Sequence, residues 1–117
     1  PALLKAGRLP QSLAICSVTL AELAAGPAAT DDPMERARRQ DRLQRVEATF
    51  EPIPFGTAAA RAYGRIYAAT VAQGRRPRRR LADLLIASIA AAEGLPLITR
   101  NFDDFVGLDE IVHVIGL

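Results

Sequence analysis

The sequence predicts an α/β fold in which helices cover both faces of a mostly parallel sheet. The first of two observations concerns neighbouring segments near the end of the sequence. An apolar helical segment over residues 81–93 stops at Gly94, an apolar strand over 95–99 follows, and a polar turn with two aspartates comes next. The other observation is the alternation of strand-like and helix-like segments along the chain. With 117 residues and no linker or repeat, residues 1–117 are predicted to form a single domain.

Local signals place each element along the chain. A Thr-x-x-Glu pattern from Thr19 to Glu22 predicts a capping box, in which the Thr19 hydroxyl binds an amide of the first turn and Glu22 reaches back to the cap. Thr57 is the predicted cap of a long helix that stops at Gly74. Helices are expected at residues 1–7, 19–26, 33–49, 57–73 and 81–93, and strands at 11–18, 50–55, 95–99 and 111–115.

The composition excludes several classes of protein. Half of the residues are hydrophobic, which argues against disorder, and no apolar run is long enough to span a membrane. Cys16 is the only cysteine, so no intrachain disulfide forms and a reducing, cytoplasmic location is expected. The chain has neither of the glycine-rich motifs that bind nucleotide phosphates, and its single histidine, His113, gives no support to a nucleophilic triad.

Three carboxylates lie just after a predicted strand or at the start of a predicted helix: Glu22, Asp83 and Asp104. In a parallel sheet, Glu22 and Asp104 both follow strands at one edge, and Asp83 opens a helix that could lean over that edge. An all-oxygen ligand set suits Mg²⁺, with Mn²⁺ as the alternative, and such ions activate water for attack on a phosphodiester.

Structural roles also fit these carboxylates. Glu22 would complete the capping box, and Asp83 would offset the dipole of its helix. One of Asp103 and Asp104 would cap the short turn that ends at Phe105.

The other unusual feature is a basic loop, in which five of the six residues from 75 to 80 are arginine. One interpretation is a solvated connector whose charges pair with acidic helix ends. The other is a loop that holds a phosphate chain beside the carboxylates, because it lies directly upstream of Asp83. The residues leave both interpretations open.

Three segments together resemble the PIN-domain ribonucleases, specifically the VapC-type toxins of toxin–antitoxin pairs. They are Thr-Leu-Ala-Glu-Leu at 19–23, the Asp-x-x-Ile-Ala helix with its Gly-Leu-Pro-Leu end at 83–97, and Thr-Arg-Asn-Phe-Asp-Asp-Phe at 99–105. The resemblance implies a three-layer α/β/α sandwich. It also implies Mg²⁺-dependent endonucleolytic cleavage of structured RNA, such as transfer or ribosomal RNA.

The resemblance also assigns roles to individual residues. Glu22, Asp83 and Asp104 occupy acidic positions of the family's motifs, which makes them the expected catalytic and metal-binding residues. Thr99 and Asn101 occupy the supporting polar positions around Asp104. The arginines expected to guide the RNA backbone are Arg78, Arg79, Arg80 and Arg100.

Members of this family begin with a central strand that ends in an Asp, and nothing in residues 1–117 matches it. We therefore expect an upstream segment of roughly twenty residues in the complete protein. Without that strand, we expect weak metal binding, little activity and poor folding unless another chain completes the sheet. The partners implied by the resemblance are a small antitoxin that covers the acidic cleft and a second copy of the toxin.

An alternative from another class is a non-catalytic PIN-like module that binds RNA or a protein through the basic loop. Glu22→Gln, Asp83→Asn and Asp104→Asn would abolish cleavage by a nuclease and leave the function of a binding module intact. A receiver-like phosphoacceptor is set aside, because it needs a lysine after a late strand and the only lysine is Lys5.

Overall fold

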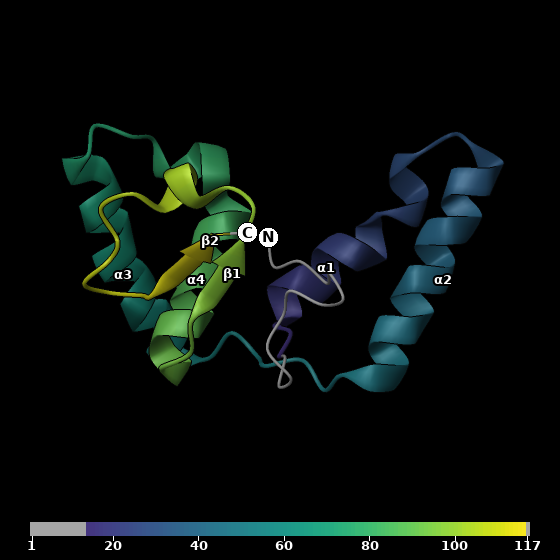
Figure 1. The fold of residues 1–117 in the computed structure, drawn as a ribbon, viewed down its shortest axis with the longest axis horizontal. Helices are drawn as coiled ribbons and strands as arrows, with labels where there is room; N and C mark the ends of the chain where they lie inside the picture. Colours follow the sequence, from purple (N-terminus) through teal and green to yellow (C-terminus); the bar gives the residue numbers. More distant parts are fainter. Residues whose placement is uncertain (1–13, 117) are drawn as a thin grey trace. The chain divides into compact units, whose positions relative to one another are not determined.

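The computed structural model describes residues 14–116, so the helix predicted for residues 1–7 lies outside the described part of the chain. Within that part, the chain forms two compact units, residues 14–54 and residues 55–116, and each is described by itself (Figure 1). No helix among the described residues combines the length and the apolar character needed to cross a membrane.

The first unit is built on two helices joined by a short turn. It contains α1 (Ser17–Ala25), the 3₁₀ helix η1 (Pro27–Ala29) and α2 (Pro33–Thr49). α2 has the predicted bounds. Its start is fixed by Asp32, whose carboxylate accepts a hydrogen bond from the Met34 amide, and by Pro33 at the first helical position.

A backbone bridge closes the first unit. The Ser17 amide donates to the Ile53 carbonyl and the Ile53 amide donates to the Ile15 carbonyl, both at 2.8 Å, which makes Cys16 and Ile53 a parallel pair. This bridge is all that the described residues form of two predicted strands, those at 11–18 and 50–55. The parallel direction agrees with the predicted sheet.

α1 begins before its predicted cap, so the capping box at Thr19 is wrong. The bridge holds Cys16 in an extended conformation and the helix starts at the next residue, Ser17. Thr19 therefore lies inside the helix, buried, with its hydroxyl 3.4 Å from the Cys16 sulfur. Glu22 closes no cap. It lies in the second turn of α1 and is exposed.

The second unit alternates helices and strands. It contains α3 (Thr57–Ala72), the 3₁₀ helix η2 (Pro77–Arg80), α4 (Leu81–Glu93), β1 (Leu97–Thr99), the 3₁₀ helix η3 (Phe102–Phe105) and β2 (Val114–Gly116). The predicted stop of α4 is confirmed: Gly94 has a φ of 66°, in the left-handed region that favours glycine, and the Leu95 amide returns to the Ala90 carbonyl. The predicted cap of α3 is wrong, because Gly56 holds that position and Thr57 is the first helical residue.

The two strands of this unit form a parallel sheet. Leu97 lies opposite Val114, and Thr99 lies opposite Gly116. The parallel pairing and the helix before β1 confirm the α/β prediction. β2 begins later than the predicted strand at 111–115, because the amides of Ile111 and Val112 bond back to Leu108 in a turn.

The core of the second unit lies between α3 and α4, which pack side by side (Figure 1). α3 buries one face of small and branched residues: Ala59, Ala62, Ile66 and Thr70. These recur three or four positions apart, as a buried helical face requires. α4 is buried at Leu84 and continuously from Ile86 to Ala90, and β1 is buried throughout. This packing fixes the first turn of α4 and the carboxyl end of β1 within one unit.

Candidate functional site

Asp83 lies in the first turn of α4, as predicted, and is partly buried. The helix starts directly after η2, with Arg80 at the cap position and no side chain capping it. A carboxylate in the first turn interacts favourably with the positive end of the helix dipole. The same placement suits a metal ligand, because the backbone there is held by the packed body of α4.

The carboxyl end of β1 leads into the acidic turn, which consists of Asn101 and η3, through a hydrogen bond at Thr99. This side chain is fully buried, and its hydroxyl oxygen accepts the amide of Asn101 at 3.0 Å. Asn101 is exposed, and its carbonyl accepts the amide of Asp104 at 2.9 Å as η3 begins. The prediction that Asp103 or Asp104 caps this turn is wrong, since Asn101 holds the cap position and both aspartates lie in the first turn.

Two arginines of the basic loop hold the acidic turn. Arg75 donates to the backbone carbonyl of Asp103 at 2.9 Å. Arg80 donates to the backbone carbonyl of Asp104 and lies 3.4 Å from a carboxylate oxygen of the same residue. The expected pairing of the loop with an acidic side chain is therefore present at Arg80, whereas Arg75 bonds to the main chain of the turn. Because Arg80 lies three residues before Asp83, it also links the start of α4 to Asp104.

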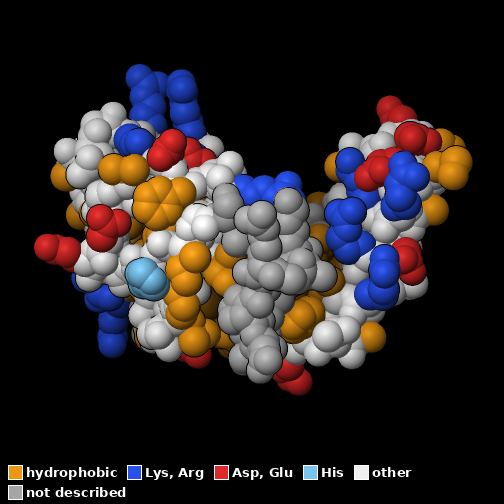
Figure 2. All heavy atoms as spheres, viewed as in Figure 1, with side chains coloured by type: hydrophobic (Ala, Val, Ile, Leu, Met, Phe, Trp, Pro, Cys, Tyr) orange, Lys and Arg blue, Asp and Glu red, His pale blue; other side chains and the backbone are white. Residues whose placement is uncertain are grey.

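An open hollow of about 740 Å³ lies beside this contact. It is lined by Gly74, Arg75, Arg76, Arg79, Arg80 and Asp104. Figure 2 shows Lys and Arg side chains projecting from the end of this unit that carries η2, next to acidic side chains. Four arginines against one carboxylate give the hollow a positive net charge, which favours anions over cations.

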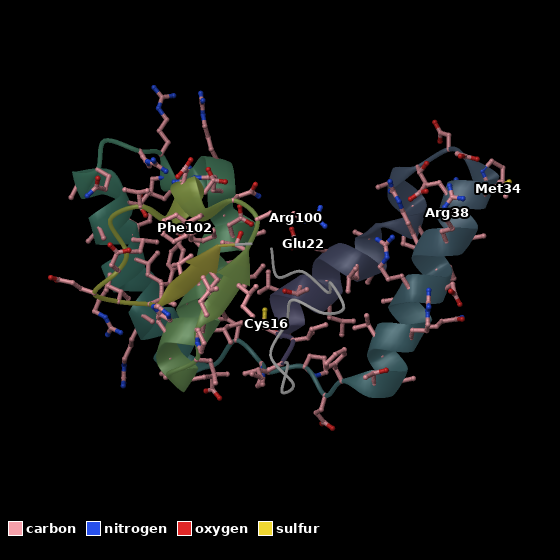
Figure 3. All side chains as sticks on the ribbon, viewed as in Figure 1. Cys16, Glu22, Met34, Arg38, Arg100 and Phe102 are labelled. Carbon is pink, nitrogen blue, oxygen red and sulfur yellow. The ribbon has the colours of Figure 1, made fainter. Side chains whose placement is uncertain are left out.

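The three predicted metal ligands do not all belong to the same unit of the chain. Asp83 and Asp104 belong to the second unit, whereas Glu22 lies on α1 of the first unit (Figure 3). Among residues 14–116, no three His, Cys, Asp or Glu side chains are gathered as a metal-binding group. The three carboxylates offer only oxygen atoms, which is the donor chemistry that Mg²⁺ and Mn²⁺ prefer. The three-carboxylate metal site stays a prediction.

The remaining predicted RNA-binding residues differ in their positions. Arg79 and Arg80 line the hollow, whereas Arg78 is exposed and is not among the lining residues. Arg100 follows β1 and is exposed (Figure 3). The sequence reasoning missed Arg75 and Arg76. The three-residue spacing of Arg76 and Arg79 around Pro77 was the signal that could have found their shared face.

Comparison with known proteins adds to this geometry. A family model described as the PIN domain matches residues 2–111. The chain is 41% identical over 106 residues to Ribonuclease VapC5 of Mycobacterium tuberculosis, covering 91% of this chain and 76% of the relative.

Two solved structures of toxin–antitoxin complexes also match this chain. The VapBC-5 toxin–antitoxin structure from M. tuberculosis matches with a TM-score of 0.84 and 38% identity, over 100% of this chain and 91% of that one. VapBC2 from Rickettsia felis, bound to a DNA fragment from its promoter, matches with a TM-score of 0.72 and 28% identity, over 91% of this chain and 75% of that one.

Proposed function

Because this chain belongs to the PIN-domain family, among its VapC-type members, we propose that it is a metal-dependent endoribonuclease and the toxin of a toxin–antitoxin pair. The relative with 41% identity is named a ribonuclease. The observation that carries the proposal within this chain is the contact between Arg80 and Asp104, which ties the acidic turn to the helix start that bears Asp83.

The proposed cofactor is Mg²⁺, with Mn²⁺ as the alternative. Glu22, Asp83 and Asp104 would hold it, in keeping with their all-oxygen chemistry. When bound, such an ion supplies Lewis acidity and lowers the pKa of a bound water. The proposed reaction is hydrolysis of a phosphodiester: a water oxygen bonds to phosphorus, the bond to the leaving ribose oxygen breaks, and that oxygen takes up a proton.

Other residues of this chain would position the reacting groups. The buried Thr99 hydroxyl fixes the path of the chain from β1 to Asn101 and so sets where η3 begins. Arg80 holds both the main chain and the carboxylate of Asp104. Arginines of the basic loop would neutralise phosphates of the RNA, which are the dominant source of affinity for a nucleic acid.

The proposed partners are an antitoxin and a second copy of the toxin. Both solved relatives described above are VapBC complexes, and one of them is bound to DNA. A cognate antitoxin would neutralise the nuclease by covering its acidic cleft. The proposed substrate class is structured RNA of the transfer or ribosomal type, and the proposed location is the cytoplasm.

The test is cleavage of total cellular RNA by the full-length, antitoxin-free protein. We expect discrete fragments with Mg²⁺ and none with EDTA. Asp83→Asn and Asp104→Asn should lower the cleavage rate by about a hundredfold or more, because each removes a ligand worth several kcal/mol of transition-state stabilisation.

The matched control is Asp103→Asn, which makes the same change in the same turn at an exposed side chain. It should cleave at nearly the original rate. Intact RNA from a folded protein with Mg²⁺ would refute the nuclease and leave the non-catalytic binding module in its place.

A further inference from the structure

The arginines of η2 (Pro77–Arg80) and Arg76, the cap residue that precedes it, occupy different positions around a 3₁₀ turn. Such a helix has 3.0 residues per turn, so side chains three positions apart lie on the same face. The amide of Arg79 donates to the carbonyl of Arg76 at 3.2 Å, which is the bond of this helix type. Arg76 and Arg79 are therefore one turn apart and bonded through their backbones, and Pro77 and Arg80 are the next pair at this spacing.

The two pairs also differ in how far they are buried. Pro77 is buried, and the Arg80 side chain is only 18% exposed because it contacts Asp104. Arg76 and Arg79 are exposed, and both line the hollow. Arg78 is three positions from neither set; it is exposed and is not among the residues that line the hollow. Neighbouring arginines thus have different surroundings.

The guanidinium groups also differ in what they contact. Arg75 and Arg80 are already bonded to the carbonyls of the acidic turn. The side chains of Arg76 and Arg79 make no hydrogen bond or ion pair with another residue in the described part of the chain. Asp104, the one carboxylate of the hollow, has its charge offset by Arg80. The positive charge that is not already engaged, and so is available to bind a ligand, lies on the guanidinium groups of Arg76 and Arg79.

We propose that Arg76 and Arg79 form a phosphate clamp, which binds neighbouring phosphates of an RNA strand and holds that strand beside Asp104. Arg75 and Arg80 act as positioning residues for the acidic turn and contribute less to RNA affinity. A strand fits better than a single phosphate, because the hollow of about 740 Å³ is open and presents two guanidinium groups on one face. Phosphate contacts of this kind carry no sequence preference. The choice of RNA rests on the proposed function.

The test measures RNA binding without cleavage. The full-length, antitoxin-free protein is titrated in EDTA into a fluorescein-labelled, 20-nucleotide single-stranded RNA, and fluorescence anisotropy gives Kd at several salt concentrations. The double variant Arg76→Gln/Arg79→Gln should raise Kd about tenfold or more and reduce the slope of log K against log salt by about 1.4, which is two lost phosphate contacts.

The matched control is Arg61→Gln/Arg65→Gln, which removes the same charge from exposed positions of α3 in the same unit. It should change Kd less than threefold. Arg78→Gln should lower the affinity less than Arg79→Gln, although both lie on η2. Arg76→Lys/Arg79→Lys should restore the salt slope, because the charges return. Equal melting temperatures would show that every variant is folded.

The outcomes separate this inference from the proposed function. A protein that cleaves RNA, but whose two double variants bind with equal Kd, refutes the clamp and leaves the nuclease standing. A protein that cleaves nothing, but loses RNA affinity only in the Arg76→Gln/Arg79→Gln variant, refutes the nuclease and supports the clamp.

Discussion

One guanidinium nitrogen of Arg80 donates to the backbone carbonyl of Asp104 and lies 3.4 Å from the Oδ1 atom of its carboxylate. The two residues are 24 positions apart in the sequence. A single side chain therefore holds both the main chain and the functional group of Asp104. Since Arg80 also occupies the cap position of α4, the acidic turn is anchored to the helix that carries Asp83.

Replacing Arg80 should loosen the acidic turn. Arg80→Met keeps most of the side-chain stem but removes the charge and the donors. We expect a loss of about 1 kcal/mol in the free energy of unfolding, since the contact is partly open to solvent. Hydrogen exchange at the amides of residues 102–106 should become faster. Urea denaturation and amide exchange measure the two effects, and unchanged exchange in this segment would contradict the anchoring role.

Removing the Thr99 hydroxyl should also destabilise the turn. Thr99→Val preserves the shape of a fully buried side chain but leaves the Asn101 amide without its acceptor. The expected cost is about 1 kcal/mol, measured by urea denaturation. Thr70→Val is the matched control, because that buried hydroxyl only adds a bond to the Ile66 carbonyl within α3. Equal losses in the two variants would show that the turn does not depend on Thr99.

Gly107 is a position where a side chain should be costly. Its φ is 90°, and a Cβ there would lie 2.6 Å from the Gln73 side-chain nitrogen. Gly107→Ala should cost about 1–2 kcal/mol through the backbone conformation. The control is Gly64→Ala, where a Cβ meets nothing within 4 Å inside α3. That change should stabilise the protein by about 0.5–1 kcal/mol.

A second comparison separates the two causes at Gly107. Gly107→Ala in a Gln73→Ala background removes the close approach but keeps the positive φ. The loss of stability should persist, because the Gln73 side chain is flexible enough to move aside. Full recovery in this background would assign the cost to the contact with Gln73 and exclude the backbone conformation as its cause.

The stability of the protein should depend on pH through Glu35, which lies on α2. Hydrogen bonds from Arg39 and Arg38 lower the pKa of this carboxyl below its ordinary value of 4.5. A lowered pKa in the folded state means that the ionised form stabilises the fold at neutral pH and that this contribution is lost as pH falls through the folded-state pKa.

The measurement for Glu35 is a pair of melting curves at several pH values. Glu35→Gln should melt below the unmodified protein at neutral pH, and the difference should shrink at pH values well below 4.5. Asp41→Asn is the control, since Asp41 forms a more exposed ion pair with Arg45 on the same helix. A difference at Glu35 that is independent of pH would rule out a role for its charge.

The elements that the sequence predicted correctly have local causes. The stop of α4 at Gly94, the buried strand that follows and the parallel pairing come from glycine conformation and from runs of apolar residues. The capping box failed because a distant contact decides where α1 begins: pairing with Ile53 holds Cys16 extended until Ser17. A pattern of four residues contains no information about that partner.

The same limit applies to the candidate site. Sequence motifs identified Asp83, Asp104 and Thr99, and the structure places them at a helix start, in the acidic turn and at a strand end of one unit. The contact between Arg80 and Asp104 joins segments far apart in the sequence, so no spacing rule predicts it. The roles of the loop arginines depend on the 3₁₀ geometry of η2, which a run of arginines alone does not specify.

The three-residue turn of η2 also constrains how this loop can change in length. Arg80 is fixed by Asp104, so deletion or insertion of one residue between Arg76 and Arg80 would rotate Arg76 by about 120° relative to that anchor. A changed loop would then present a different residue to the hollow, even with every arginine still present. Related proteins that keep this loop should therefore vary its length in steps of whole turns, while substitutions at the outward position of Arg78 are tolerated freely.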